Sequence, residues 1–271
     1  MRRIMPAWRL AALVIAGTAA TTSAARAGAW PEPVGHWLAI ETFSDYHAAS
    51  QGYGQFGQPA GRGRYVQYEL SPYIEYGLTP RLTLGFQPRA QEVIQSNLPG
   101  TRGATGFVQF NLWARYAVWR DAWNVISVQG QLGIPGVQSP ASPVLAQPGA
   151  EYEGRVLFGH AFRLPGGWSG YTDLEAGYRM EVDGWADQIR ADGTIGIRPR
   201  RGWLLLAQGF NTISVGTAAP GGSDYNLYRV AFSVVHDLTH HVAVQAGLWH
   251  DAGGRNVALG NAGFLAVWLR F

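Results

Sequence analysis

Apolar and polar residues alternate with a period of two in twelve segments of this chain, a pattern typical of β-strands with one apolar face. In the fourth segment, for example, Val108, Phe110 and Leu112 share one face, while Gln109 and Asn111 share the other. The segments span residues 34–47, 62–76, 81–92, 105–118, 123–135, 151–163, 168–180, 187–198, 203–215, 226–236, 241–250 and 261–271. Helical crossovers, which parallel strands require, have no counterpart between them, so we predict an all-β, antiparallel fold.

The links between these segments alternate in length. Short links at 77–80, 119–122, 164–167, 199–202 and 237–240 alternate with generally longer ones at 48–61, 93–104, 136–150, 181–186, 216–225 and 251–260. A twelve-stranded transmembrane β-barrel with tight periplasmic turns and longer extracellular loops needs five of the first kind and six of the second. Segment 203–215 fits least well because it begins with consecutive apolar residues, and we expect a bulge or register change there.

The polar faces of the segments separate a membrane barrel from a soluble sandwich. They combine Gln, Asn, Gly, Glu and Arg in mid-strand, and the chain contains no Lys. Such faces are typical of a narrow wet lumen in which Arg pairs with Asp or Glu across strands. We expect these charged residues to line it: Glu41, Glu69, Glu75, Arg81, Arg89, Arg115, Glu153, Arg155, Asp173, Glu175, Arg179, Arg190, Asp192, Arg229 and Arg270. These residues either line a solute path or fill a closed lumen as structural ion pairs, and the sequence is compatible with both roles.

The N-terminal 27 residues have the features of a secretory signal peptide. Arg2, Arg3 and Arg9 precede an apolar stretch at 10–20, and Ala25-Arg26-Ala27 provides a cleavage site before Gly28. The apolar stretch is shorter than the roughly 20 residues of a spanning helix, which disfavours an uncleaved anchor. We therefore predict a signal peptide at 1–27 and a barrel domain at 28–271. Four of the 21 basic residues lie in this leader, leaving 17 against 18 acidic residues, which does not favour nucleic acid as a partner.

The C-terminal segment and the aromatic residues indicate the bacterial outer membrane. Leu265, Val267, Leu269 and the terminal Phe271 share one face, which resembles the C-terminal signature that the barrel-assembly machinery recognises in Gram-negative outer-membrane barrels. Aromatic residues lie near both ends of the segments, as two interfacial girdles require: Tyr76, Trp119, Trp123, Trp168, Trp203 and Phe271 at the short turns, and Tyr46, Tyr65, Phe107, Tyr152, Trp185 and Tyr228 at the long loops.

One hairpin resembles a known family. Residues 71–85, with the sequence Ser-Pro-Tyr-Ile-Glu-Tyr-Gly-Leu-Thr-Pro-Arg-Leu-Thr-Leu-Gly, are similar to the second hairpin of a family of outer-membrane β-barrel proteins associated with the meta-cleavage pathway of phenol degradation. The resemblance covers a small part of the chain. It implies a barrel that transports apolar or aromatic compounds, and it carries over no residue roles.

Motifs for catalysis or metal binding are weak. The adjacent pair His240 and His241 would point to opposite faces of a strand, and the chain has no Cys. His160 lies on a predicted outer face, where outer-membrane acyl hydrolases keep a His and Ser pair, but Gly159-His160-Ala161-Phe162 departs from their pattern. We predict a channel for small solutes, with no cofactor and no metal. The alternatives are a non-conducting structural or adhesion barrel and, less favoured, a lipid acyl hydrolase.

Overall fold

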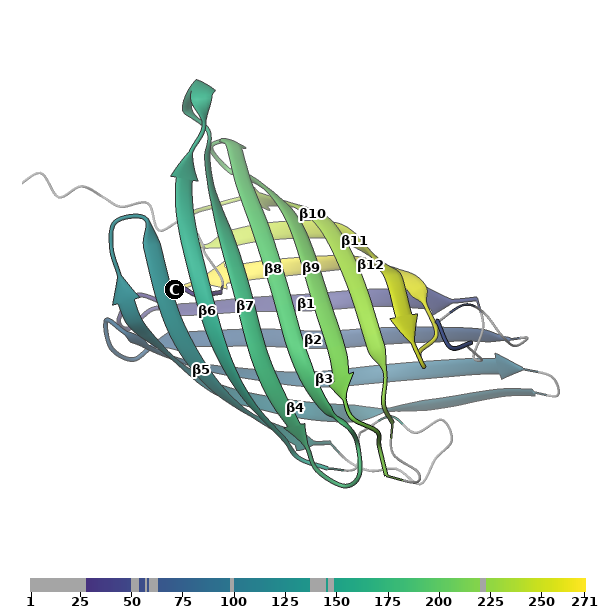
Figure 1. Cartoon of the computed structure of the whole chain (residues 1–271). Helices are drawn as coiled ribbons and strands as arrows, with labels where there is room; N and C mark the ends of the chain where they lie inside the picture. The colour runs from purple at the N-terminus through teal and green to yellow at the C-terminus, as the bar shows by residue number, and fades with distance from the viewer. Residues whose placement is uncertain are drawn as a thin grey trace, which may run out of the picture.

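A computed structural model describes residues 28–49, 54–56, 58, 63–97, 100–136, 145, 149–219 and 223–271; the predicted signal peptide lies outside them. The described residues form twelve antiparallel strands that close into a barrel, which confirms the predicted fold (Figure 1). The strands are β1 (Trp37–Ala48), β2 (Arg64–Gly77), β3 (Leu82–Asn97), β4 (Gly100–Arg120), β5 (Asn124–Pro135), β6 (Glu151–Arg163), β7 (Ser169–Glu181), β8 (Asp187–Arg200), β9 (Trp203–Val215), β10 (Asn226–Asp237), β11 (Val242–Arg255) and β12 (Gly260–Arg270). A 3-10 turn, η1 (Pro165–Gly167), lies between β6 and β7.

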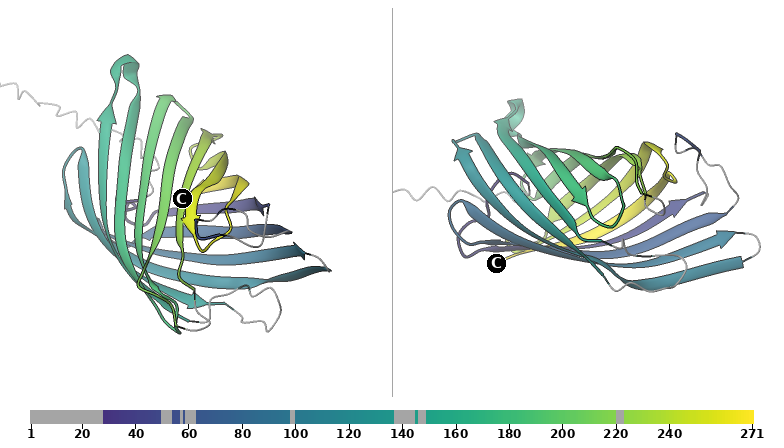
Figure 2. Two further views of the ribbon diagram at one scale, coloured as in Figure 1. Left: turned by 45° about the vertical axis from the view of Figure 1, so that its right-hand side comes forward. Right: turned by 60° about the horizontal axis from the view of Figure 1, so that its bottom comes forward.

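The first and last strands close the barrel. Each strand pairs with its sequence neighbours, and β1 pairs with β12 from Leu38 opposite Arg270 to Ala48 opposite Gly260. Phe271 extends this ladder, because its backbone N–H and C=O both pair with Trp37 at 3.0 Å. The views in Figure 2 show that the barrel is flattened, with β6–β9 crossing over β1–β3. Closure gives each of the twelve described strands a partner on both edges, as a lipid environment requires.

Side chains at the short turns fix their geometry. Thr79 Oγ1 accepts hydrogen bonds from the backbone N–H groups of Arg81 and Leu82, and Thr239 caps the β10–β11 turn in the same way. In the β4–β5 turn, Asp121 Oδ1 accepts two backbone N–H groups at 2.7 Å. These donors favour the charged carboxylate, so they hold the pKa of Asp121 below its usual value.

Two predicted long loops are shorter than expected because their strands continue beyond the alternating region. The loop predicted at 93–104 is mostly strand, since β3 extends to Asn97 and β4 begins at Gly100. The loop predicted at 251–260 shrinks in the same way, because β11 extends to Arg255. Strand ends that project beyond a bilayer face water on both sides and need no apolar face. Alternation therefore underestimates their length.

Two of the register shifts in the barrel lie where the sequence did not predict them. Arg89 pairs with Gln109 and Ala90 with Phe107, so Val108 is the extra residue of a bulge and is buried rather than facing outward with Phe110. The pairing of β9 with β10 is regular throughout, and the bulge expected in 203–215 lies instead between Ile197 and Arg200 on β8. β9 begins with consecutive apolar residues because both of its faces are apolar there.

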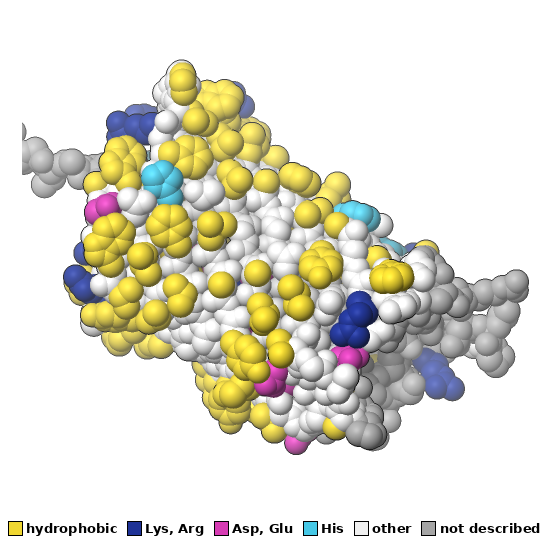
Figure 3. Space-filling view, in the orientation of Figure 1, with side chains coloured by type: hydrophobic (Ala, Val, Ile, Leu, Met, Phe, Trp, Pro, Cys, Tyr) yellow, Lys and Arg dark blue, Asp and Glu magenta, His cyan; other side chains and the backbone are white. Residues whose placement is uncertain are grey.

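The outer face of the barrel is apolar. Phe232, Leu248 and Leu265 are 65%, 68% and 63% exposed, and they alternate with buried residues along their strands. Figure 3 shows hydrophobic side chains spread over one such face, with charged side chains mainly towards its ends. An exposed apolar surface of this extent suits lipid rather than water. In the described part of the chain, no helix is long and apolar enough to cross a membrane.

Candidate functional site in the barrel lumen

Residues 28–36, which we call the N-terminal strap, cross the inside of the barrel at its short-turn end. Ala29 is fully buried; its N–H donates to Asp173 Oδ2 at 2.5 Å and its C=O accepts from Ser127 Oγ at 2.6 Å. Further along, Glu32 N–H donates to Thr83 Oγ1 at 2.9 Å, and Gly35 N–H donates to Gly77 at 2.8 Å. The strap therefore spans from β7 and β5 to β3 and β2 before it enters β1.

An aromatic anchor holds the middle of the strap. The ring of Trp30 contacts Tyr171 on β7 edge to face, with ring centroids 5.8 Å apart. It also covers Gly159 on β6, where an added Cβ would lie 2.5 Å from the indole. The backbone C=O of Trp30 accepts a hydrogen bond from Arg115 Nη2 at 3.1 Å. A small residue at 159 is thus what allows the indole to pack against the wall.

Beneath the strap lies a fully buried ion pair. Arg115 on β4 and Glu75 on β2 approach to 2.7 Å, and their side chains are 2% and 0% exposed. Tyr73 and Trp113 also donate to Glu75. The half-buried carboxyl of Glu32 in the strap lies near this pair, and partial burial and the charge of Glu75 raise its pKa from 4.5 to about 7.

A cluster of charges centred on Arg155 covers the inner faces of β6, β7 and β8. Arg155 pairs with Glu175 at 2.8 Å, with Asp192 at 2.7 Å and with Glu153 on its own strand. Each partner lies on an alternate residue of its strand, so all three side chains enter the barrel.

The same network continues around the barrel to β2. Arg179 pairs with Glu151 at 2.8 Å, and Gln109 links Glu151 to Arg89, which pairs with Glu69 at 2.8 Å. We call the inner side chains of β2–β8 in this network the charged wall; it consists of Glu69, Arg89, Gln109, Glu151, Glu153, Arg155, Glu175, Arg179 and Asp192. Each of its charged side chains is in an ion pair, which keeps a polar surface stable inside the barrel.

The opposite side of the lumen is apolar at the short-turn end. Its buried cluster, which we call the apolar wall, comes mainly from β1 and β9–β12: Leu38, Tyr171, Leu204, Leu206, Val235, Ala243, Ala266 and Trp268, with Ile40 and Trp30 packed against it. Because Leu204 and Leu206 face this cluster while Leu205 faces outward, both sides of β9 are apolar. The lumen therefore has two walls of different chemistry.

Aromatic residues surround an arginine near the long-loop end. The guanidinium of Arg229 lies 5.7 Å from the ring centre of Tyr46 and 5.1 Å from that of Trp249, and it pairs with Asp251 at 2.6 Å. Tyr46 also donates to Asp251 at 2.8 Å and packs edge to face on Tyr65. We call these five residues the aromatic box. Tyr46 and Tyr65 were expected in the outer girdle, and they face the interior instead.

Most of the charged residues expected in the lumen lie on the inner face. They are Glu69, Glu75, Arg89, Arg115, Glu153, Arg155, Asp173, Glu175, Arg179, Arg190, Asp192, Arg229 and Arg270. Glu41 differs: it is exposed on the outer face of β1 opposite Val267, because Leu38 and Ile40 occupy inner positions. Arg81 also differs, since it is exposed in the turn before β3.

Some inner charges were not expected from the sequence. Glu151, Asp237 and Asp251 are in ion pairs with inner arginines. Alternation would have identified Glu151, which precedes Glu153 by two residues, whereas nothing in the pattern indicates Glu32 in the strap. Arg190 and Asp173 enter the barrel, and neither has an ion pair among the described residues.

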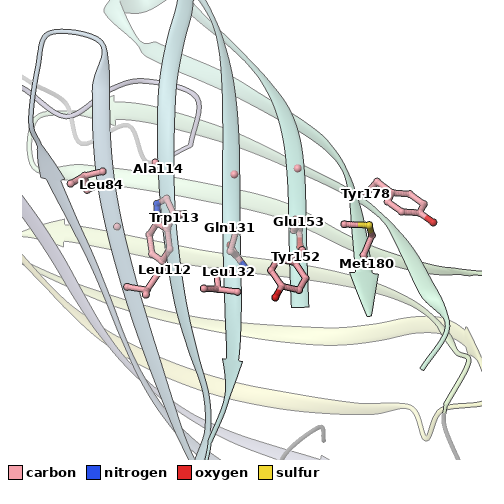
Figure 4. Close-up of a pocket in the computed structure, with 13 residues that line it drawn as sticks. Leu84, Leu112, Trp113, Ala114, Gln131, Leu132, Tyr152, Glu153, Tyr178 and Met180 are labelled. Carbon is pink, nitrogen blue, oxygen red and sulfur yellow. The ribbon is translucent and has the colours of Figure 1, made fainter. Parts of the chain in front are cut away.

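The outer wall carries an apolar hollow between β3 and β7 of about 830 Å³. Figure 4 shows Leu112, Leu132, Tyr152 and Met180 around it, each from a different neighbouring strand. The hollow exists because Gly130 lies opposite Gly154 there, so two adjacent strands present no side chain to the lipid.

The residues considered for catalysis do not form a recognisable site. His160 faces outward on β6, and its Nδ1 lies 2.7 Å from the amide oxygen of Asn124, which is not a nucleophile. No cluster of three or more metal-ligating side chains occurs in the described ranges.

Comparisons with known proteins agree with this fold. No known protein family and no curated protein matches the sequence. Among solved structures, the chain is similar to an outer-membrane channel from Pseudomonas putida F1, with a TM-score of 0.69 and 16% identity over 91% of this chain and 99% of that one. It also resembles the β domain of the Bordetella autotransporter BrkA (TM-score 0.56, 14% identity, 88% of this chain and 100% of that one) and the NanC porin (TM-score 0.51, 9% identity, 85% and 98%).

These similarities concern the fold, because the identities are low. Together with the closed antiparallel barrel and its apolar outer face, they establish the class of the molecule: the chain is an outer-membrane β-barrel.

Proposed function

We propose that the protein is a channel for small solutes, with the path running between the charged wall and the apolar wall. The observation that carries this proposal is the chemistry of the lumen: paired charges line one side from β2 to β8, and apolar side chains line the other. A twelve-stranded barrel is wider than filled eight-stranded barrels and narrower than porins of roughly 16 strands. Such a bore suits solutes of small cross-section.

The different chemistry of the two walls indicates which class of solute would suit the path. A molecule with an apolar or aromatic body and one polar group would contact the apolar wall with its body and the charged wall with its polar group. The aromatic box favours planar rings, because Tyr46 and Trp249 already hold the planar guanidinium of Arg229. The resemblance of residues 71–85 to a family associated with phenol degradation favours the same class.

Single-channel recording in a planar bilayer tests this function. We expect discrete conductance steps from the folded barrel and brief interruptions when benzoate, a small aromatic acid, is added. Acetate at the same concentration is the control for charge without a ring. Trp249→Leu should shorten the interruptions by removing one face of the aromatic box, whereas Trp203→Leu, outside the lumen at the short-turn end, should not.

A non-conducting barrel is the second candidate, and the N-terminal strap favours it because it fills the interior at the short-turn end. A folded protein that shows no conductance and no solute-dependent current would support this candidate and contradict the channel. Biogenesis follows the sequence features: we propose that residues 1–27 are removed and that the barrel-assembly machinery recognises the strand ending at Phe271.

A further inference from the structure

Asp173 is a buried carboxylate without a cationic partner. Its side chain lies inside the barrel on β7 and is 3% exposed, and no ion pair between described residues includes it. The charged groups that act on it are Glu175, two residues along the same face, whose carboxyl is hydrogen-bonded to that of Asp173, and Arg115 across the lumen. Glu175 is paired with Arg155 and Arg115 with Glu75, so both are already engaged. Two hydrogen-bonded carboxyls in a buried site hold a proton between them unless a further positive charge lets both ionise.

The beginning of the N-terminal strap lies against this carboxylate. Asp173 Oδ2 accepts the N–H of Ala29 at 2.5 Å, and an added Cβ on Gly28 would collide with the same carboxylate. The Cα of Gly28 is therefore in contact with Asp173, and the nitrogen of Gly28 is bonded to that Cα. Gly28 has a φ of +102°, which favours glycine at this position.

The sequence pattern alone places the end of the predicted signal peptide at Ala27. Hydrolysis of the Ala27–Gly28 peptide bond by a leader peptidase consumes one water, leaving a carboxylate on Ala27 and an amine on Gly28 that takes up a proton. We propose that Asp173 is the binding site for this new α-ammonium group, and that processing thereby locks the N-terminal strap inside the barrel. The inference rests on the proposed cleavage at this bond.

The position of the strap explains why this contact matters. Ala29 packs against Ala117, Val125 and Leu157, so the strap end is enclosed by apolar side chains. An ammonium group enclosed there keeps its charge only beside a carboxylate, and Asp173 is the carboxyl group that contacts Gly28 and Ala29. Before cleavage, Gly28 carries a neutral amide and the ion pair does not exist. The locked strap is therefore a property of the processed protein.

The absence of Lys makes the test specific, because the α-amino group is then the single primary amine of the processed chain. We would express the full chain with its own leader, extract the barrel in detergent and determine its N-terminus by mass spectrometry. The rate of reaction with an amine-selective acylating reagent is then measured against pH, both folded and in urea. An α-amino group normally has a pKa of about 8, and a neighbouring carboxylate raises it by about 1 unit or more.

We expect a mature chain beginning at Gly28 whose α-amine has a higher pKa in the folded protein than in urea, with about tenfold slower acylation near pH 8. Asp173→Asn should lower the pKa and restore faster acylation. Glu181→Gln, which removes an inner carboxyl at the other end of the same strand, should not. Cleavage elsewhere, a folded pKa at or below the value in urea, or an unchanged amine in Asp173→Asn would overturn it. If the variant does not fold, the titration of the wild-type amine still tests the ion pair with Asp173. None of these readouts depends on conductance.

Discussion

The indole of Trp30 lies directly over Gly159, so closely that a Cβ at position 159 would be 2.5 Å from a ring carbon. Gly159→Ala should therefore displace the indole and lower the free energy of unfolding by about 1–3 kcal/mol, as overpacking does. Urea unfolding in detergent measures this. Gly154→Ala on the same strand is the matched control, because an added Cβ there meets nothing within 4 Å. Equal unfolding midpoints for the two variants would refute the packing of the strap.

The buried pair of Glu75 and Arg115 should be sensitive to loss of either partner. Glu75→Gln or Arg115→Met leaves one charge without its partner in a dry site and should cost about 3–5 kcal/mol of unfolding free energy. The double variant should cost less than the sum of the single ones, since it leaves neither charge behind. A double-mutant cycle in urea measures the coupling, and strict additivity would contradict it. Glu69→Gln, in a more exposed pair, should cost less.

The raised pKa of Glu32 predicts that the strap weakens in base. Its folded pKa of about 7 lies above the unfolded value of 4.5, so the folded state binds the proton more tightly. Its stabilising contribution is complete below pH 4.5 and is lost as pH rises through 7. The urea midpoint of the wild type should therefore fall more between pH 5.5 and 8.5 than that of Glu32→Gln. A parallel fall in both proteins would exclude Glu32 as the cause, and Glu92→Gln at an exposed site is the control.

Single cysteines in this Cys-free chain report the orientation of β4. Cys at Phe110 or Leu112 should resist a membrane-impermeant thiol reagent in vesicles, while Cys at Gln109 should react, because these side chains face opposite sides of the barrel. Val108 is unsuitable because it lies in the bulge. Equal reactivity at all three positions would contradict the barrel orientation of this strand.

Alternation predicted the strands well wherever one face meets lipid and the other meets polar groups. On β4, it correctly set Arg115 inward and Leu112 outward. It failed for Glu41, because β1 carries apolar residues on both faces and its register cannot be determined from the sequence. The strap was not predicted at all. Trp30-Pro31-Glu32-Pro33 has no periodicity, and its partners, such as Asp173 and Thr83, are far away in the sequence.

If ions and small solutes pass along the charged wall, its charges should set the ion selectivity, which the reversal potential under a tenfold KCl gradient measures. Arg155 lies in that wall, whereas Arg163 lies on the same strand at its exposed short-turn end. We predict that Arg155→Gln shifts the reversal potential toward cation selectivity and that Arg163→Gln shifts it far less. A folded wild-type barrel that does not conduct, or equal shifts for both variants, would contradict a solute path along the charged wall.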